Sequence, residues 1–144
     1  MAEDSSRSSP SALLAPHERR RRQLLQLTAS ICSLSALAAL LDPDRVAAVM
    51  GLFLVGVNGY SQFYAIYVGT RLATAALALL AARPGQPPIL GDLTALFILA
   101  QPAGRLVAAT AIGLPQGMLL WVTVLELAIG ILLLALRSRP LTLR

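Results

Sequence analysis

The chain has 144 residues, a length that predicts a single domain. Hydrophobic residues make up 56% of it and charged residues 13%, which is typical of a membrane protein and excludes a soluble basic domain. The net charge of +5 does not indicate nucleic-acid binding, because all twelve basic residues are arginines and most of them flank apolar segments, where they set membrane topology.

The first predicted element is a disordered basic cytoplasmic tail over residues 1–22. It is rich in Ser, Pro and Ala and ends in four consecutive arginines, 19–22. The uncharged segment 23–41 is long enough for a first membrane span, and the arginines before it are expected to stay in the cytoplasm. A cleaved signal peptide is the alternative for this region, although the apolar segment is long for one.

The segment 46–60 is the ambiguous part of the chain. It is apolar, short for a span and contains three glycines, which favours an interfacial or re-entrant helix. A fifth span here would move the C-terminal arginines to the outer side, against the positive-inside bias. The sequence therefore predicts four spans with both termini in the cytoplasm.

The remaining spans are predicted at 63–82, 93–112 and 118–136, followed by a cytoplasmic tail at 137–144. The predicted fold is all-α: a four-helix transmembrane bundle over 23–136, with an extra short interfacial or re-entrant helix between spans one and two.

Two stripes of small residues recur at every fourth position and predict faces that pack on other helices, unless they only reflect the abundance of alanine. They are Ala65, Gly69 and Ala73 in span two and Ala100, Gly104 and Ala108 in span three.

Three charged residues fall inside predicted spans. Arg105 lies eight residues before the turn 113–117 and Glu126 nine residues after it. On antiparallel helices these offsets place both side chains about 12–14 Å below one surface, and Arg71 lies about 12 Å below it in span two. Because a lone charge at that depth is costly, we predict a buried charge layer in which Glu126 binds one or both arginines. The sequence leaves three roles open for this layer: a structural clamp, a site for an anion or lipid headgroup, and proton handling by Glu126.

A polar group near this layer is a candidate pocket mouth or, alternatively, an aromatic belt at the membrane surface. It consists of Asn58, Gln62, Tyr64 and Tyr67. His17 is the single histidine and lies in the tail, so no histidine-based metal site, cofactor or catalytic residue is expected. Asp42, Asp44 and Asp92 lie near span ends and are expected to need no partner.

Short motifs over residues 25–136 resemble a bacterial family of small four-span membrane proteins of unknown function, distantly similar in layout to DoxX-like proteins. They are Ala65-Ile66-Tyr67-Val68-Gly69-Thr70-Arg71-Leu72, Gly104-Arg105-Leu106, Gly113-x-Pro115 and Leu125-Glu126-Leu127. Val68 stands where the family usually has a glycine, and Tyr64 where an arginine often precedes the tyrosine motif. The resemblance implies the four-span fold and a bacterial inner membrane, and no activity.

The sequence thus predicts a small multi-pass protein of the bacterial inner membrane that is a non-enzymatic scaffold or a subunit of a membrane complex. The alternative is an anion or small-molecule binder or transporter that uses the charge layer, and a minor one is a membrane oxidoreductase component, by analogy with DoxX-like proteins. Its expected partners are the lipid bilayer and other membrane proteins or further copies of itself, with no nucleic acid.

Overall fold

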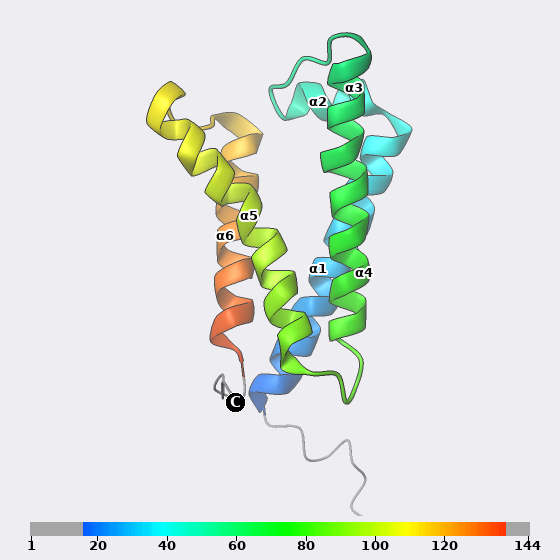
Figure 1. Ribbon diagram of the computed structural model, residues 1–144, viewed down its shortest axis with the longest axis vertical. Coiled ribbons are helices and arrows are strands. Elements are labelled where there is room, and N and C mark those ends of the chain that lie inside the picture. Colours follow the sequence, from blue (N-terminus) through cyan, green and yellow to red (C-terminus); the bar gives the residue numbers. More distant parts are fainter. Residues whose placement is uncertain (1–15, 138–144) are drawn as a thin grey trace, which may run out of the picture.

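The structure is a computed structural model that describes residues 16–137, and this part of the chain is helical without strands (Figure 1). This confirms the predicted all-α fold class. The elements in order are α1 (Pro16–Leu41), α2 (Pro43–Val49), α3 (Gly56–Tyr64), the π-helix η2 (Ala65–Thr70), α4 (Arg71–Ala81), α5 (Pro88–Ile112) and α6 (Gly117–Ala135).

Four helices are long and apolar enough to cross a membrane, as expected of a multi-pass membrane protein. Three of them are α1, α5 and α6. The fourth is the continuous helix Gly56–Ala81, in which α3, η2 and α4 follow one another without a break. The second of them starts at Gly56, seven residues before the predicted span. Residues 16–22, predicted to be disordered, are the first turns of α1. The rest of the predicted tails, 1–15 and 138–144, lies outside the described residues.

The short helix between the first two spans covers Pro43–Val49 and not the predicted 46–60. Its N-cap is Asp42, whose side chain accepts a hydrogen bond from the Arg45 backbone N–H at 3.1 Å. Pro43 occupies the first turn, where a missing N–H costs nothing. The proline that ends α1 therefore also begins α2.

The long helices form two pairs, α1 with the Gly56–Ala81 helix and α5 with α6, and α4 joins them by packing on α5. Figure 1 shows the pairs converging where α1 begins and α6 ends, and diverging toward α2 and the turn 113–117. We call the first end of the bundle the closed end and the second the open end.

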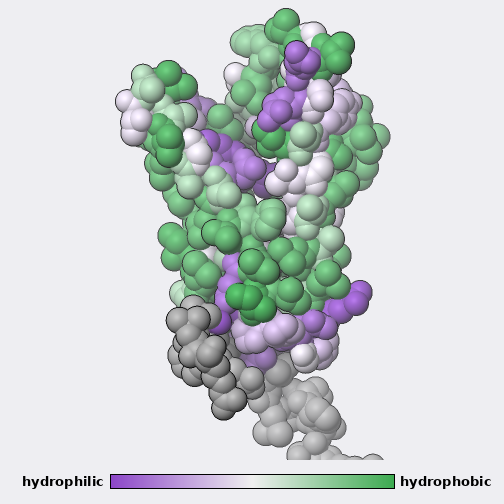
Figure 2. Space-filling view, viewed as in Figure 1, coloured by the Kyte–Doolittle hydropathy of each residue, from purple (hydrophilic) through white to green (hydrophobic). Residues whose placement is uncertain are grey.

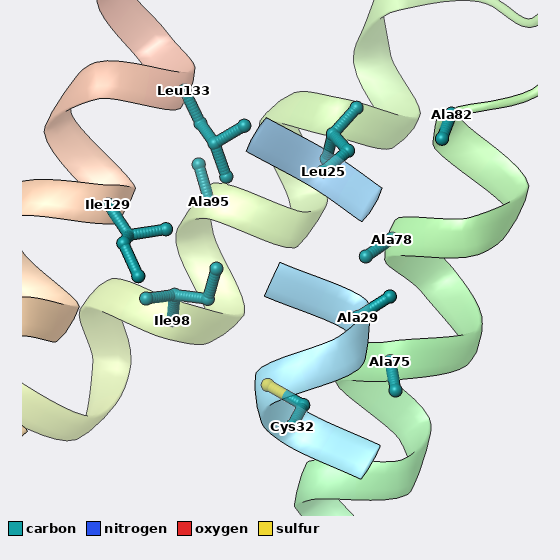
Figure 3. Packing of buried hydrophobic residues seen from close by; sticks show 10 residues of the cluster. All are labelled: Leu25, Ala29, Cys32, Ala75, Ala78, Ala82, Ala95, Ile98, Ile129 and Leu133. Carbon is teal, nitrogen blue, oxygen red and sulfur yellow. The ribbon is translucent and has the colours of Figure 1, made fainter. Parts of the chain in front are cut away.

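The larger cluster of the core fills the closed half and is built largely from small side chains. Figure 3 shows Ala29 of α1 and Ala78 of α4 pointing toward each other, and both are buried. Small residues let helix backbones approach closely, which is how helices associate in lipid. The other buried members of this cluster are Leu25, Cys32, Ala75, Ala82, Ala95, Ile98, Ile129 and Leu133.

The two stripes of small residues predicted to pack are instead exposed along their whole length. A Cβ atom at Gly104 would have no neighbour within 4 Å. Alanine is so frequent in this chain that a four-residue repeat occurs on several helix faces, so its presence does not identify the face that packs. In the second span the repeat also crosses η2, whose i→i+5 hydrogen bonds do not keep residues four apart on one face.

Candidate functional site

The structure brings the three charged residues of the predicted layer into direct contact and links α4, α5 and α6 through them. Arg71 donates from Nη2 to Oε1 of Glu126 at 2.5 Å. Arg105 donates from Nη1 to Oε2 of the same carboxylate, also at 2.5 Å. Glu126 therefore bridges both arginines, with one oxygen for each. We refer to these three residues as the charge layer.

The charge layer is mostly buried and carries one surplus positive charge. The Glu126 side chain is 6% exposed and each arginine side chain 16%. Arg105 Nη1 also donates to Thr123 Oγ1 at 3.2 Å, and that hydroxyl donates to the Leu119 carbonyl at 2.7 Å. Both carboxylate oxygens are thus occupied, whereas each guanidinium has further N–H groups for another acceptor.

Both arginines follow an irregularity in their own helix. Arg71 comes directly after η2, in which Thr70 Oγ1 donates to the carbonyl of Ala65, five residues back. Pro102, buried inside α5, lies one turn before Arg105 and cannot donate to the carbonyl of Ile98. π-Helices often occur at functional sites, because they alter the direction of a few side chains within a long helix.

A cavity of about 360 Å³ reaches the charge layer at the open end. Its charged lining residues are Arg45, Arg71 and Glu126. Figure 2 shows that hydrophilic residues gather in the hollow between the diverging helix pairs, on a surface that is otherwise largely hydrophobic. The apolar walls of the cavity are formed by Ile31, Ala38, Val46, Val49, Met50, Ile98, Val122, Leu125 and Ile129.

Helix α2 contributes one wall of this cavity, which sequence reasoning missed. Its residues in this wall are Arg45, Val46 and Val49, and Met50, directly after the helix, lines the cavity as well. The Tyr60 hydroxyl ties α2 to α3 by donating to Asp44 Oδ1 at 2.5 Å. The Asp42-Pro43 pair was the available signal, because an N-cap residue followed by proline is typical of a helix start.

Of the predicted pocket mouth, only Tyr67 lines the cavity. Its ring stacks on Phe63 with centroids 4.6 Å apart. Asn58 and Gln62 are exposed, and Tyr64 packs edge-on against Phe63 with centroids 6.2 Å apart; none of these three lines the cavity. Asn58 and Gln62 are four residues apart on α3 and share an exposed face, so the polar cluster read from the sequence is divided between two faces.

Thr28 of α1 also lines the cavity and is 2% exposed. Its Oγ1 has no hydrogen-bond partner among residues 16–137. The other threonines in this part of the chain each donate to a carbonyl of their own helix. Because buried hydroxyls are normally hydrogen-bonded, Thr28 is a polar group that a molecule in the cavity can satisfy.

A second cluster of charges, at the closed end, was not predicted. Asp92 Oδ1 accepts a hydrogen bond from Arg21 Nη2 at 2.5 Å, and Arg137 Nε lies 3.1 Å from Oδ2. The expectation that Asp92 needs no partner was wrong. We call Arg21, Asp92 and Arg137 the closed-end cluster.

Arg21, expected in a disordered tail, is instead 7% exposed. Besides Asp92, it binds the backbone carbonyls of two other helices. Its Nε donates to the carbonyl of Leu133 at 3.1 Å, and Nη1 and Nη2 are both 3.3 Å from the carbonyl of Pro88. Gly91 provides the space, because a Cβ atom there would lie 2.7 Å from Arg21 Nη2.

No group of three or more His, Cys, Asp and Glu side chains that could hold a metal ion is found within residues 16–137. No curated protein and no solved structure matches the chain. A family model described as "Domain of unknown function (DUF4345)" matches residues 21–137, so it includes both the charge layer and the closed-end cluster. The chain therefore belongs to the DUF4345 family.

Proposed function

We propose that this membrane protein binds a small amphiphilic anion, with its apolar part in the open-end cavity and its charged group near Arg71. The observation that carries the proposal is that a cavity with apolar walls reaches a buried layer of surplus positive charge. Its volume of about 360 Å³ lies within the range of ligand sites in proteins, about 300–1,000 Å³.

The charge of the lining favours an anion. Arg45 and Arg71 outnumber Glu126 there, and Arg45 forms no ion pair with any residue from 16 to 137. Glu126 holds Arg71 in place but leaves part of its guanidinium for another acceptor. The unpartnered Thr28 hydroxyl adds a hydrogen-bonding group to the same cavity.

The apolar part of the ligand is favoured by the position of the cavity. Most of its wall comes from α1 and α6, two membrane-spanning helices that pack on each other less than either packs on its own pair partner. A molecule dissolved in the bilayer can therefore enter sideways between them. We place the protein in a bacterial inner membrane with its closed end on the cytoplasmic side. The reason is that Arg19–Arg22, Arg83 and Arg137 lie at the closed end, and arginines gather on the cytoplasmic side of membrane proteins.

A photoreactive dodecanoate that carries a diazirine tests this function in the purified full chain. Peptide mass spectrometry should locate the label on the cavity-lining parts of α1 and α6. Unlabelled dodecanoate should compete about tenfold better than dodecanol, because the carboxylate gains a hydrogen bond to a charged group, and about 1.4 kcal/mol corresponds to a tenfold difference. Arg45→Gln should reduce this preference and leave the fold intact, since Arg45 is exposed.

Two matched variants separate the cavity from the lipid-facing surface. Ala38→Phe places a ring in the cavity and should abolish labelling. Leu37→Phe adds a ring at the neighbouring position, which does not line the cavity, and should leave labelling unchanged. Equal labelling of both variants would reject the proposal.

A structural clamp in a membrane scaffold is the second function, and a specific observation favours it: both oxygens of Glu126 already have an arginine partner. The clamp requires no ligand. Failure of the labelling experiment, combined with a large loss of stability on Glu126→Gln, would favour the clamp.

A further inference from the structure

A second cavity, of about 300 Å³, lies at the closed end, between the start of α1, the loop 82–87 and the start of α5. It is separate from the proposed function, which uses the other end of the bundle. Its lining includes Arg21, Arg22 and Arg83, with Glu18 as the acidic residue. We call it the closed-end pocket.

Two of these arginines have charge available for a ligand. Arg21 is already engaged by Asp92 and by the carbonyls of Pro88 and Leu133. Arg22 and Arg83, in contrast, form no ion pair with any residue from 16 to 137. The pocket thus contains more positive charge than the protein itself neutralises.

The N-terminus of α5 adds to this positive potential. Pro87, Pro88 and Gly91 line the pocket, and no side chain caps the helix at this end. Pro87 and Pro88 have no backbone N–H, so α5 contributes here through the partial positive charge of its N-terminus, carried by the N–H groups that follow them, which stabilises a nearby anion. The apolar part of the lining includes Leu25, Ala81 and Ala82.

We propose that the closed-end pocket binds a phosphate group through Arg22 and Arg83. A guanidinium matches the geometry of phosphate oxygens and can bind two of them at once. The phosphate can come from the headgroup of an anionic phospholipid or from free phosphate. The pocket lies at the ends of membrane-spanning helices and has an apolar side, as a phospholipid headgroup site requires.

The test uses the purified full chain in detergent after removal of bound lipid. Its thermal unfolding is followed with added phosphatidylglycerol, phosphatidylcholine or inorganic phosphate. Phosphatidylglycerol should stabilise the wild type more than phosphatidylcholine. The double variant Arg22→Gln, Arg83→Gln should need about thirtyfold more phosphatidylglycerol for the same effect, since each arginine near a lipid surface contributes about 1 kcal/mol.

Arg19→Gln, Arg20→Gln is the matched control, because both residues are exposed at the same end of α1 and neither lines the pocket. It should keep the wild-type response. Gln86→Glu adds a negative charge to the lining without removing an arginine, and it should weaken the response in a protein that folds normally.

The outcomes are distinct. Competition by millimolar inorganic phosphate would identify free phosphate as the source, and its absence would identify the lipid headgroup. An equal loss in the Arg19, Arg20 control would attribute the effect to diffuse surface charge and overturn the proposal. A wild type that neither phosphatidylglycerol nor phosphate stabilises would overturn it as well.

Discussion

The two ends of the bundle contain the same set of charges, one carboxylate between two arginines, in different surroundings. At the open end Glu126 lies in the middle of α6 and holds its arginines through side-chain contacts. At the closed end Asp92 lies in the second turn of α5, and its partner Arg21 also binds two backbone carbonyls.

This difference suggests that one cluster anchors the helices to one another and that the other can bind a ligand. An arginine that donates to carbonyls of two other helices fixes the positions of their backbones. The charge layer makes no such backbone contact through its arginines within residues 16–137, and a cavity borders it. The closed-end cluster is therefore suited to holding the helices together, and the charge layer to responding to a bound anion.

The largest effect is expected at Glu126. Glu126→Gln leaves both Arg71 and Arg105 without a counter-charge inside the membrane and should cost about 3–5 kcal/mol of unfolding free energy, the range for broken buried ion pairs. Arg105→Gln should cost less, because Arg71 still binds the carboxylate. Unfolding in sodium dodecyl sulfate measures both. A Glu126→Gln variant as stable as wild type would mean that the charge layer contributes no net stability.

Two glycines of α5 allow a matched comparison of the ends. Gly91→Ala should displace the Arg21 guanidinium from its partners and cost about 1–3 kcal/mol, as overpacking of a filled site does. Gly104→Ala should be neutral or stabilise by up to about 1 kcal/mol, because its Cβ would point into open space and alanine is the better helix former. The same unfolding assay compares them, and equal effects would contradict the close packing at the closed end.

Among the variants that remove an ion pair, Asp92→Asn is expected to lose the least stability. Arg21 and Arg137 would both lose the charge of Asp92, but Arg21 would keep its hydrogen bonds to the carbonyls of Leu133 and Pro88. A loss of about 1–2 kcal/mol is expected, close to the value of one hydrogen bond to a charged group. If Asp92→Asn destabilises more than Glu126→Gln in the same assay, the closed end is held mainly by the Asp92 carboxylate and not by the hydrogen bonds of Arg21 to the backbone.

The charge layer could be foreseen because its geometry depends on quantities that the sequence contains. Helix rise is constant, so counting residues from the turn 113–117 gives the relative depth of Arg105 and Glu126. The long apolar segments likewise indicate the spans. The start of α2 was readable too, because Asp42 followed by Pro43 is the pattern of a helix N-cap and first turn.

The closed-end cluster could not be foreseen in this way. Arg21 and Asp92 are 71 residues apart, and Arg21 and Leu133 are 112 apart. No local pattern connects them, because a run of arginines before a span is equally consistent with solvated side chains. The role of Gly91 depends on the position of the Arg21 side chain and is visible only after folding.

The π-helix η2 rotates the side chains that follow it in the second span relative to those that precede it. Each residue turns an α-helix by about 100°, so the wider turn of residues 65–70 offsets the part before it from the part after it. The earlier part is aligned so that Tyr60 reaches α2, and the later part so that Arg71 reaches Glu126. Removing one residue from η2 would restore a regular helix, and only one of these two alignments could then be kept. The π-turn thus lets a single rigid span serve two neighbours that an unbroken α-helix could not face together.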